Sequence, residues 1–380
     1  MFKAGVLWLH KWLGIISGVI VLLVSLSGAI YVFADDLKVL VYPERYMLPI
    51  DGSGTTKPLS SLIQLAESQL AENEKVTRVD LYPEKNRSWV FRAVATNPNG
   101  FGLWNYFTYY KRVFINPYSG AVIGTEDATK EFFQLTLELH MNLLLGKTFG
   151  NPIVSYATLI FVIMLISGIV LWWPRNSKRK TLQRSFMLKT KVKWKRLNYD
   201  LHNVIGFYSF IFALVLGLSG LVFSFPSLRE NYIALFNKIN SKATEASKLS
   251  ESAENIPIVY QDPLDNTLLY LLDTYPQAAM MSIRLKSEDS PQIDVQVRNK
   301  KGRTGDFAWY YVDKNTQQVN KVVRSSSLEI GDKLAAINYD IHTGGIGGYF
   351  TKFIACLISL FCASLPITGY ILWWNKTKKR

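Results

Sequence analysis

Four long apolar stretches constrain this chain more than any other feature. They cover residues 12–33, 152–173, 205–225 and 353–374, and none of them contains a charged residue. A helix of about twenty residues crosses a hydrocarbon core about 30 Å thick. The composition agrees, because 49% of the residues are apolar and only 19% are charged. The sequence therefore predicts an α-helical membrane bundle of four transmembrane helices.

The distribution of basic residues predicts the orientation of these helices. The chain has a net charge of +14, and its excess of Lys and Arg lies before the first stretch, in 174–200 and after the fourth stretch. Since basic loops remain on the cytoplasmic side, both termini should be cytoplasmic. Anionic headgroups explain these charges, so we expect contact with membrane lipids and none with nucleic acid. The first stretch is longer than a signal-peptide core and no small-residue cleavage site follows it, so we expect it to be retained.

These assignments divide the chain into eight parts. They are the N-terminus with the first helix, an outside segment, the second helix, a cytoplasmic loop, the third helix, another outside segment, the fourth helix and a cytoplasmic tail. The corresponding residues are 1–33, 34–150, 151–173, 174–200, 201–225, 226–349, 350–375 and 376–380.

The two halves of the chain resemble each other. His10 precedes Gly28 by 18 residues, and His202 precedes Gly220 by the same 18. Later in each half, His140 and His342 precede a glycine and then a Trp-Trp pair at nearly equal spacing. Such self-similarity predicts an internal two-fold repeat.

Both outside segments carry the same order of patterns, a helix followed by strands separated by turns. The first has a helix at 59–72 and strands at 76–82, 88–95, 106–115 and 121–124. The second has a helix at 262–274 and strands at 280–286, 292–298, 307–312 and 317–323. We therefore predict two small α+β modules.

Two bends are expected where the outside segments enter the membrane. Residues 131–145 form an amphipathic helical pattern, and we expect Gly150 and Pro152 to break the helix after it. The glycine-rich stretch 344–348 is expected to form the equivalent bend in the second half. Each bend follows directly after a histidine.

The sequence resembles the PepSY-associated transmembrane family, whose members include inner-membrane, haem-containing ferric-siderophore reductases of the ferrioxamine-reductase type. The resemblance covers nearly the whole chain. Its motifs are Leu9-His10, Leu201-His202, His140, His342, the turn Asn116-Pro117-Tyr118-Ser119-Gly120, Trp172-Trp173 and Trp373-Trp374. It implies PepSY-like outside modules and a bacterial inner-membrane location. The second turn, 313–317, departs from the family's Pro-x-Thr-Gly pattern.

The chain has only four histidines, and each lies beside a transmembrane helix. A single interfacial histidine commonly bonds a carbonyl or a headgroup, but two repeat-related pairs indicate function, because ionisable groups near the membrane are costly. A helix that spans the membrane is about 30 Å long, so histidines on opposite sides cannot share a small ligand. We therefore expect His10 to pair with His202 on the cytoplasmic side and His140 with His342 on the outside.

Two imidazoles complete the coordination of a porphyrin iron, which already has four in-plane nitrogens. Zinc or copper would need three or four protein ligands, and no Cys or carboxylate cluster lies near either pair in sequence. Because the chain has no Cys-x-x-Cys-His motif, covalent attachment is excluded. We expect two non-covalent haem b groups, each with two histidine ligands.

The chain has no dinucleotide or flavin fingerprint, so its electrons should come from a cytoplasmic donor or the quinone pool. The resemblance implies that the acceptor is a ferric siderophore, which releases iron on reduction to Fe(II). Other possibilities are an electron carrier with a different outside acceptor and a non-redox metal-binding or sensory module. A proton-coupled transporter is disfavoured, since the four apolar stretches contain no charged residue.

Overall fold

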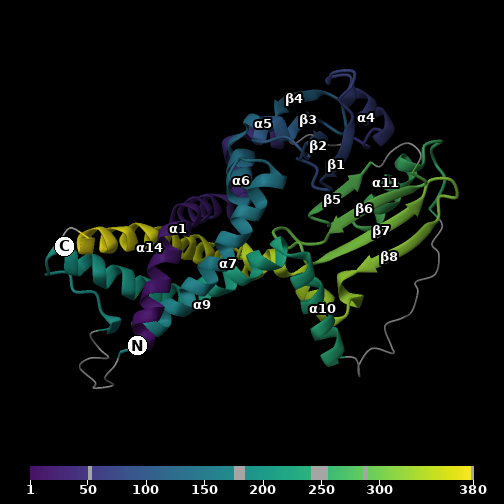
Figure 1. The fold of residues 1–380 in the computed structure, drawn as a ribbon. Coiled ribbons are helices and arrows are strands. Elements are labelled where there is room, and N and C mark those ends of the chain that lie inside the picture. The colour runs from purple at the N-terminus through teal and green to yellow at the C-terminus, as the bar shows by residue number, and fades with distance from the viewer. Residues whose placement is uncertain (50–53, 175–184, 241–255, 286–289, 378–380) are drawn as a thin grey trace. The chain divides into compact units, whose positions relative to one another are not determined.

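The computed structural model describes residues 1–49, 54–174, 185–240, 256–285 and 290–377. The chain forms two compact units (Figure 1). The first consists of Met1–Phe33, Leu135–Arg229 and Ile341–Arg380, and the second of Ala34–Gln134 and Glu230–Asp340. Most of the predicted cytoplasmic loop, from 175 to 184, lies outside the described residues, as do residues 378–380 of the tail.

The first unit contains four helices that are long and apolar enough to cross a membrane, as predicted. They are α1 (Phe2–Tyr31), α7 (Lys147–Trp172), α9 (Trp194–Ser224) and α14 (Tyr349–Thr377). Helices α1 and α9 both pack against α7 and α14, so they lie on opposite sides of the bundle. Residues of α1 and α9 can therefore face each other across the axis of the bundle.

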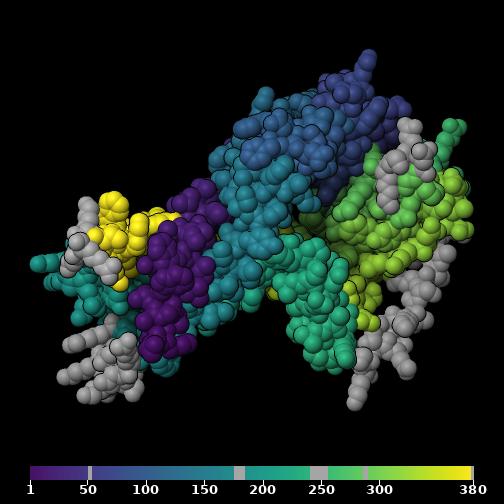
Figure 2. Space-filling model, viewed as in Figure 1, coloured from purple at the N-terminus to yellow at the C-terminus, as the bar shows by residue number. Residues whose placement is uncertain are grey.

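Small residues form much of the helix contacts, and large apolar side chains point away from them. Ser17, Gly18, Ala213 and Gly217 are buried, whereas Trp8, Ile16 and Ile211 are among the exposed apolar residues. Small residues let membrane helices approach closely, and lipid covers the outer face. Side chains of α1, in purple, form part of that outer surface in Figure 2.

The bend before α7 lies four residues earlier than predicted. The preceding helix, α6 (Phe132–Asn142), ends where Leu143, Leu144 and Gly146 adopt positive φ angles of 53°, 59° and 78°. The prediction that Gly150 and Pro152 break the helix is wrong, because both lie inside α7. Gly150 instead permits close packing, since a Cβ there would lie 1.7 Å from the Asn142 carbonyl oxygen.

The equivalent bend in the second half is confirmed. The short helix α13 (Asn338–His342) is followed by Gly344 and Gly348, whose φ angles are 73° and 70°, and α14 then begins at Tyr349. L-residues other than glycine rarely adopt these angles. His140 and His342 therefore both lie at the end of a helix just before a sharp turn.

The second unit contains an eight-stranded antiparallel sheet in the order β4-β3-β2-β1-β5-β6-β7-β8. The strands are β1 (Val76–Leu81), β2 (Trp89–Thr96), β3 (Phe107–Ile115), β4 (Val122–Asp127), β5 (Met280–Arg284), β6 (Gln292–Arg298), β7 (Phe307–Asp313) and β8 (Val319–Arg324). The expected separation into two modules is corrected here, because β1 pairs with β5 and joins all eight strands. This pairing removes the exposed strand edge that each separate module would have had.

One face of this sheet carries the hydrophobic core. Helices α4 (Leu59–Glu67) and α11 (Pro263–Thr274) contribute Leu59, Leu62, Leu268 and Leu271 to it, together with alternate residues of the strands. Ser60 of α4 bonds Asp265 of α11, so the two helices are also linked to each other. The core therefore includes residues from both halves of the chain.

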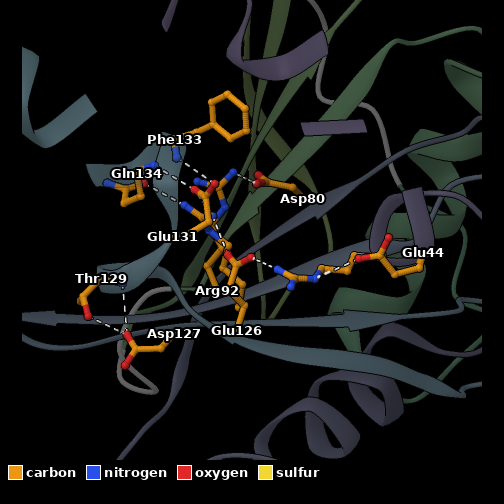
Figure 3. A network of polar contacts seen from close by, with 11 residues as sticks. Glu44, Asp80, Arg92, Glu126, Asp127, Thr129, Glu131, Phe133 and Gln134 are labelled. Atoms are coloured by element: carbon orange, nitrogen blue, oxygen red, sulfur yellow. Dashed lines mark hydrogen bonds and ion pairs between the residues drawn. The ribbon is translucent and has the colours of Figure 1, made fainter. Parts of the chain in front are cut away.

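The opposite face of the sheet carries buried charges. Asp80 is fully buried, forms ion pairs with Arg78 and Arg92, and accepts a hydrogen bond from the Ser282 hydroxyl of β5 at 2.9 Å. Burial by itself would raise the pKa of the Asp80 carboxyl, but Arg92 and Arg78 hold it below its usual value. Figure 3 shows Asp80 and Arg92 together with Glu126 of β4 and Glu131, which directly precedes α6.

We predict that Asp80→Asn lowers the stability of the sheet by about 3 kcal/mol, because two partly exposed arginines lose their anion. A carboxyl with a lowered folded-state pKa stabilises the fold above its unfolded-state pKa of about 4, and this stabilisation is lost as pH falls through the folded-state value. Hydrogen exchange of β1 and β5 should therefore become less pH-dependent below about pH 4 in the variant. Asp273→Asn, at an exposed position, is the control. Equal effects of the two substitutions would contradict this assignment.

Candidate functional site

The four histidines of the first unit lie in two pairs, and these are the pairs expected from the topology. His10 of α1 faces His202 of α9 with ring centres 6.4 Å apart and the ring planes at 86°. His140 of α6 lies near His342 of α13, with ring centres 6.0 Å apart and planes at 58°. Each pair thus combines one histidine from each half of the chain.

The two pairs lie at different levels of the bundle. Lys3 donates a hydrogen bond to the Trp173 carbonyl at 2.6 Å, so the start of α1 and the end of α7 share the level close to His10. His140 bonds the carbonyl oxygen of Val24, fourteen residues beyond His10 along α1. At 1.5 Å per residue this separation corresponds to about 20 Å.

Each histidine is anchored through its Nδ1 atom. The partners of His10 and His202 are the hydroxyls of Ser167 and Thr368, both at 2.8 Å. These hydroxyls donate their own hydrogens to helix carbonyls, so they can accept a hydrogen from the ring. The Nδ1 atoms therefore carry the hydrogen in this pair.

The other pair is anchored in a similar way. His140 donates from Nδ1 to the Val24 carbonyl at 2.8 Å, and His342 lies 3.1 Å from the Leu216 carbonyl and 2.9 Å from the Ser219 hydroxyl. A carbonyl oxygen only accepts, so Nδ1 again carries the hydrogen. In the described part of the chain no hydrogen bond uses Nε2 of any of the four rings. Each Nε2 lone pair is therefore available to a metal, and the Nδ1 bond orients the ring as is usual for metal-ligating histidines.

A glycine lies against each ring. A Cβ built on Gly168 would lie 3.4 Å from Cε1 of His10, and one on Gly369 would lie 3.5 Å from Cε1 of His202. In the other pair, a Cβ on Gly220 would lie 3.4 Å from Cε1 of His342, and one on Gly28 only 2.9 Å from Cε1 of His140. Each glycine follows a hydroxyl residue, namely Ser27, Ser167, Ser219 or Thr368. The spacing of the glycines was visible in the sequence, but the role of Ser167 and Thr368 as histidine anchors was not predicted.

The spacing of the rings fits a shared metal. Two imidazoles on opposite sides of one ion, with metal–nitrogen bonds of about 2 Å, have ring centres roughly 6.3 Å apart. The observed distances are 6.4 and 6.0 Å. Among the described residues no group of three or more His, Cys, Asp and Glu is placed to hold a metal ion. Two histidines leave a bare zinc ion short of ligands, whereas haem iron needs only these two axial nitrogens.

The glycine contacts give a prediction that separates the two sites. In Gly28→Ala the added methyl group would clash with the His140 ring and force it to move. This variant should therefore lose the haem expected at the His140/His342 pair. Gly168→Ala creates a contact at 3.4 Å, which a small shift accommodates. Absorption spectra of the purified variants should show about half of the expected haem in the first and nearly all in the second. Equal losses would show that these glycines do not define the sites.

Comparison with known proteins agrees with a membrane protein of this architecture. The model of the family described as PepSY-associated TM region matches residues 7–376. No curated protein matches the chain. The match includes α7 and α9, nearly all of α1 and α14, all four histidines and the whole eight-stranded sheet. The chain therefore belongs to the PepSY-associated TM family.

Proposed function

We propose that this protein is an inner-membrane, b-type di-haem electron-transfer protein that reduces ferric siderophores on the outer side of the membrane. The observation that carries the proposal is the pairing of the histidines, with ring centres 6.4 and 6.0 Å apart and no hydrogen bond to any Nε2 from the residues that the structure describes. Haem bound at each pair would supply one-electron chemistry with six-coordinate iron.

The chain's own residues perform three tasks in this proposal. The Nε2 atoms of the four histidines hold the iron, and the Nδ1 bonds prevent the rings from rotating. Apolar residues between the two levels, including Leu165, Ala213 and Ile358, are buried and exclude water. A dry bundle core favours electron transfer over ligand binding at the iron.

The order of the strands is consistent with the predicted internal repeat and supports the same proposal. Four strands from each half extend outward from the central β1–β5 pair, in mirrored order. The hydroxyl residue and glycine recur beside all four histidines. Duplication of a PepSY module and its two helices would supply one ligand to each site from each half, which explains why the sites form across the halves.

The basic termini support an orientation with the His10/His202 site on the cytoplasmic side. We infer that a haem held by His10 and His202 would lie nearer a cytoplasmic donor or the quinone pool, and that a haem held by His140 and His342 would supply one-electron chemistry nearer the outside acceptor. One electron reduces each Fe(III) to Fe(II), and the siderophore then releases the iron because it binds Fe(II) weakly. The resemblance supplies the identity of the acceptor.

The first test is the haem content and its assignment to residues. A pyridine haemochrome assay should give close to two protohaems per chain. His10→Ala and His202→Ala should each affect the same spectral component, and the double variant should add little, because both residues hold one iron. Ser209→Ala, which removes a buried hydroxyl of α9 bonded only to its own helix, is the packing control. Additive effects of His10 and His202, or a protein that holds zinc, would refute the proposal.

The second test is directional. Reduced protein should be reoxidised by a ferric siderophore added on the outer face, with Fe(II) captured by a chromogenic chelator. His342→Ala should abolish this reaction and leave the other haem reducible, because the last step is lost. The siderophore should have no effect on inside-out vesicles. Equal activity from both faces would contradict the orientation.

A further inference from the structure

Four arginines lie in a row across the sheet of the second unit. In the strand register Arg112 of β3 is opposite Arg92 of β2, Arg92 is opposite Arg78 of β1, and Arg78 is opposite Arg284 of β5. Like charges directly opposite each other destabilise a sheet, by up to about 1 kcal/mol per pair. Three such pairs in succession at the centre of a sheet call for a counter-charge.

Carboxylates form ion pairs with three of the four arginines. Arg112 forms an ion pair with Glu126 at 2.8 Å, and Asp80 forms ion pairs with both Arg92 and Arg78. Arg284 forms no ion pair within the described residues, although Asp294 is its partner in the register. Among the described residues Arg284, on β5 where the two halves of the sheet meet, is thus the arginine of the row that forms no ion pair.

The positive charge of Arg92 and Arg112 also lowers the pKa of Tyr110, which lies on the same face of the sheet. Burial by itself would raise the pKa of this phenol, but Arg92 and Arg112 lower it below its ordinary value. Lys38 of α2 (Ala34–Val41) has a lowered pKa, first because it is buried and then because Arg112 is near. An anion at this face would be stabilised by the same groups.

Two donors without partners among the described residues lie on the same face of the sheet as Arg284, one on Trp309 beside it and one on Arg298, which is opposite Met280 at the other end of the β5–β6 pairing. Trp309 Nε1 and Arg298 Nε are buried and have no hydrogen-bond partner in the described part of the chain. The Arg284 guanidinium lies 4.7 Å from the centre of the Trp309 ring, and the Trp309 ring is stacked with Tyr311 at 6.3 Å and 19°. Buried donors without partners are costly, by about 1–3 kcal/mol each, so they indicate a missing acceptor.

The face is accessible to a ligand. Arg284 is exposed, and the side chains of Arg78 and Arg92 are 29% and 32% exposed. Trp309 and Tyr311 are half-buried. The site thus offers the exposed Arg284 guanidinium and the stacked aromatic surface of Trp309 and Tyr311.

We propose that Arg284, Trp309 and Tyr311 bind an anionic Fe(III) complex of an aromatic, catecholate-type chelator. This inference rests on the proposed function and specifies its substrate class. Guanidinium groups recognise anionic oxygens through charge-assisted hydrogen bonds, and aromatic chelator rings pack on Trp309 and Tyr311. A neutral or cationic hydroxamate complex would leave the arginines without an anion.

The test uses Ga(III) complexes, which have the charge of the Fe(III) complexes but do not accept an electron. Binding to the full-length protein in nanodiscs of zwitterionic lipid is measured by equilibrium dialysis. A tris-catecholate complex should bind at least tenfold more tightly than a trishydroxamate complex. Arg284→Gln should weaken catecholate binding about tenfold or more. Arg303→Gln, at an exposed arginine outside the row, should leave it unchanged.

Three results would overturn the inference. The first is equal affinity for both complexes. The second is unchanged catecholate binding by the Arg284→Gln variant when its melting temperature is also unchanged. The third is competition by nanodiscs of anionic lipid, which would show that the arginine row binds lipid headgroups. The failure of the proposed function is separate, because binding of Ga(III) needs no haem. A haem-free protein that still binds the catecholate would refute only the proposed function. A reductase whose binding ignores Arg284 would refute only this inference.

Discussion

The hydrogen bond from each histidine Nδ1 to a neighbouring helix is the interaction on which the candidate site depends. It gives each ring a fixed orientation and leaves Nε2 available for a metal. The glycine beside each ring provides the space for this arrangement. Without these two features four histidines near a membrane would be ordinary interfacial residues.

The membrane imposes the second constraint. Helices satisfy their own backbone groups within the hydrocarbon, so a group held in the core of this bundle must be bound by side chains that face each other across it. Helices α1 and α9 lie on opposite sides and meet this condition for His10 and His202. His140 and His342 come to face each other in another way, because each lies near the end of a short helix that precedes a sharp turn.

Much of the local structure followed from the sequence. The strand predicted at 292–298 has these bounds in β6, and the four transmembrane helices lie where the apolar stretches predict them. Such elements are determined by periodicity over short distances. The position of the bend before α7 was predicted wrongly, because the positive φ angles of Leu143 and Leu144 have no signature in residue type.

The features that were missed depend on contacts between residues far apart in the chain. The joining of two predicted modules into one sheet requires the pairing of β1 with β5, and Arg78 and Arg284 become neighbours only through that register. Ser167 and Thr368 are also unremarkable in sequence until the fold places them beside His10 and His202. A single sequence does not show which distant strands pair, or in which register they do so.

An experimental density map of the protein, purified from haem-replete cells, tests the central claim most directly. The account predicts one planar group with a central metal between the Nε2 atoms of His10 and His202, and a second between those of His140 and His342. Rings that contact each other with no group between them, or a group held by any other residue, would contradict it.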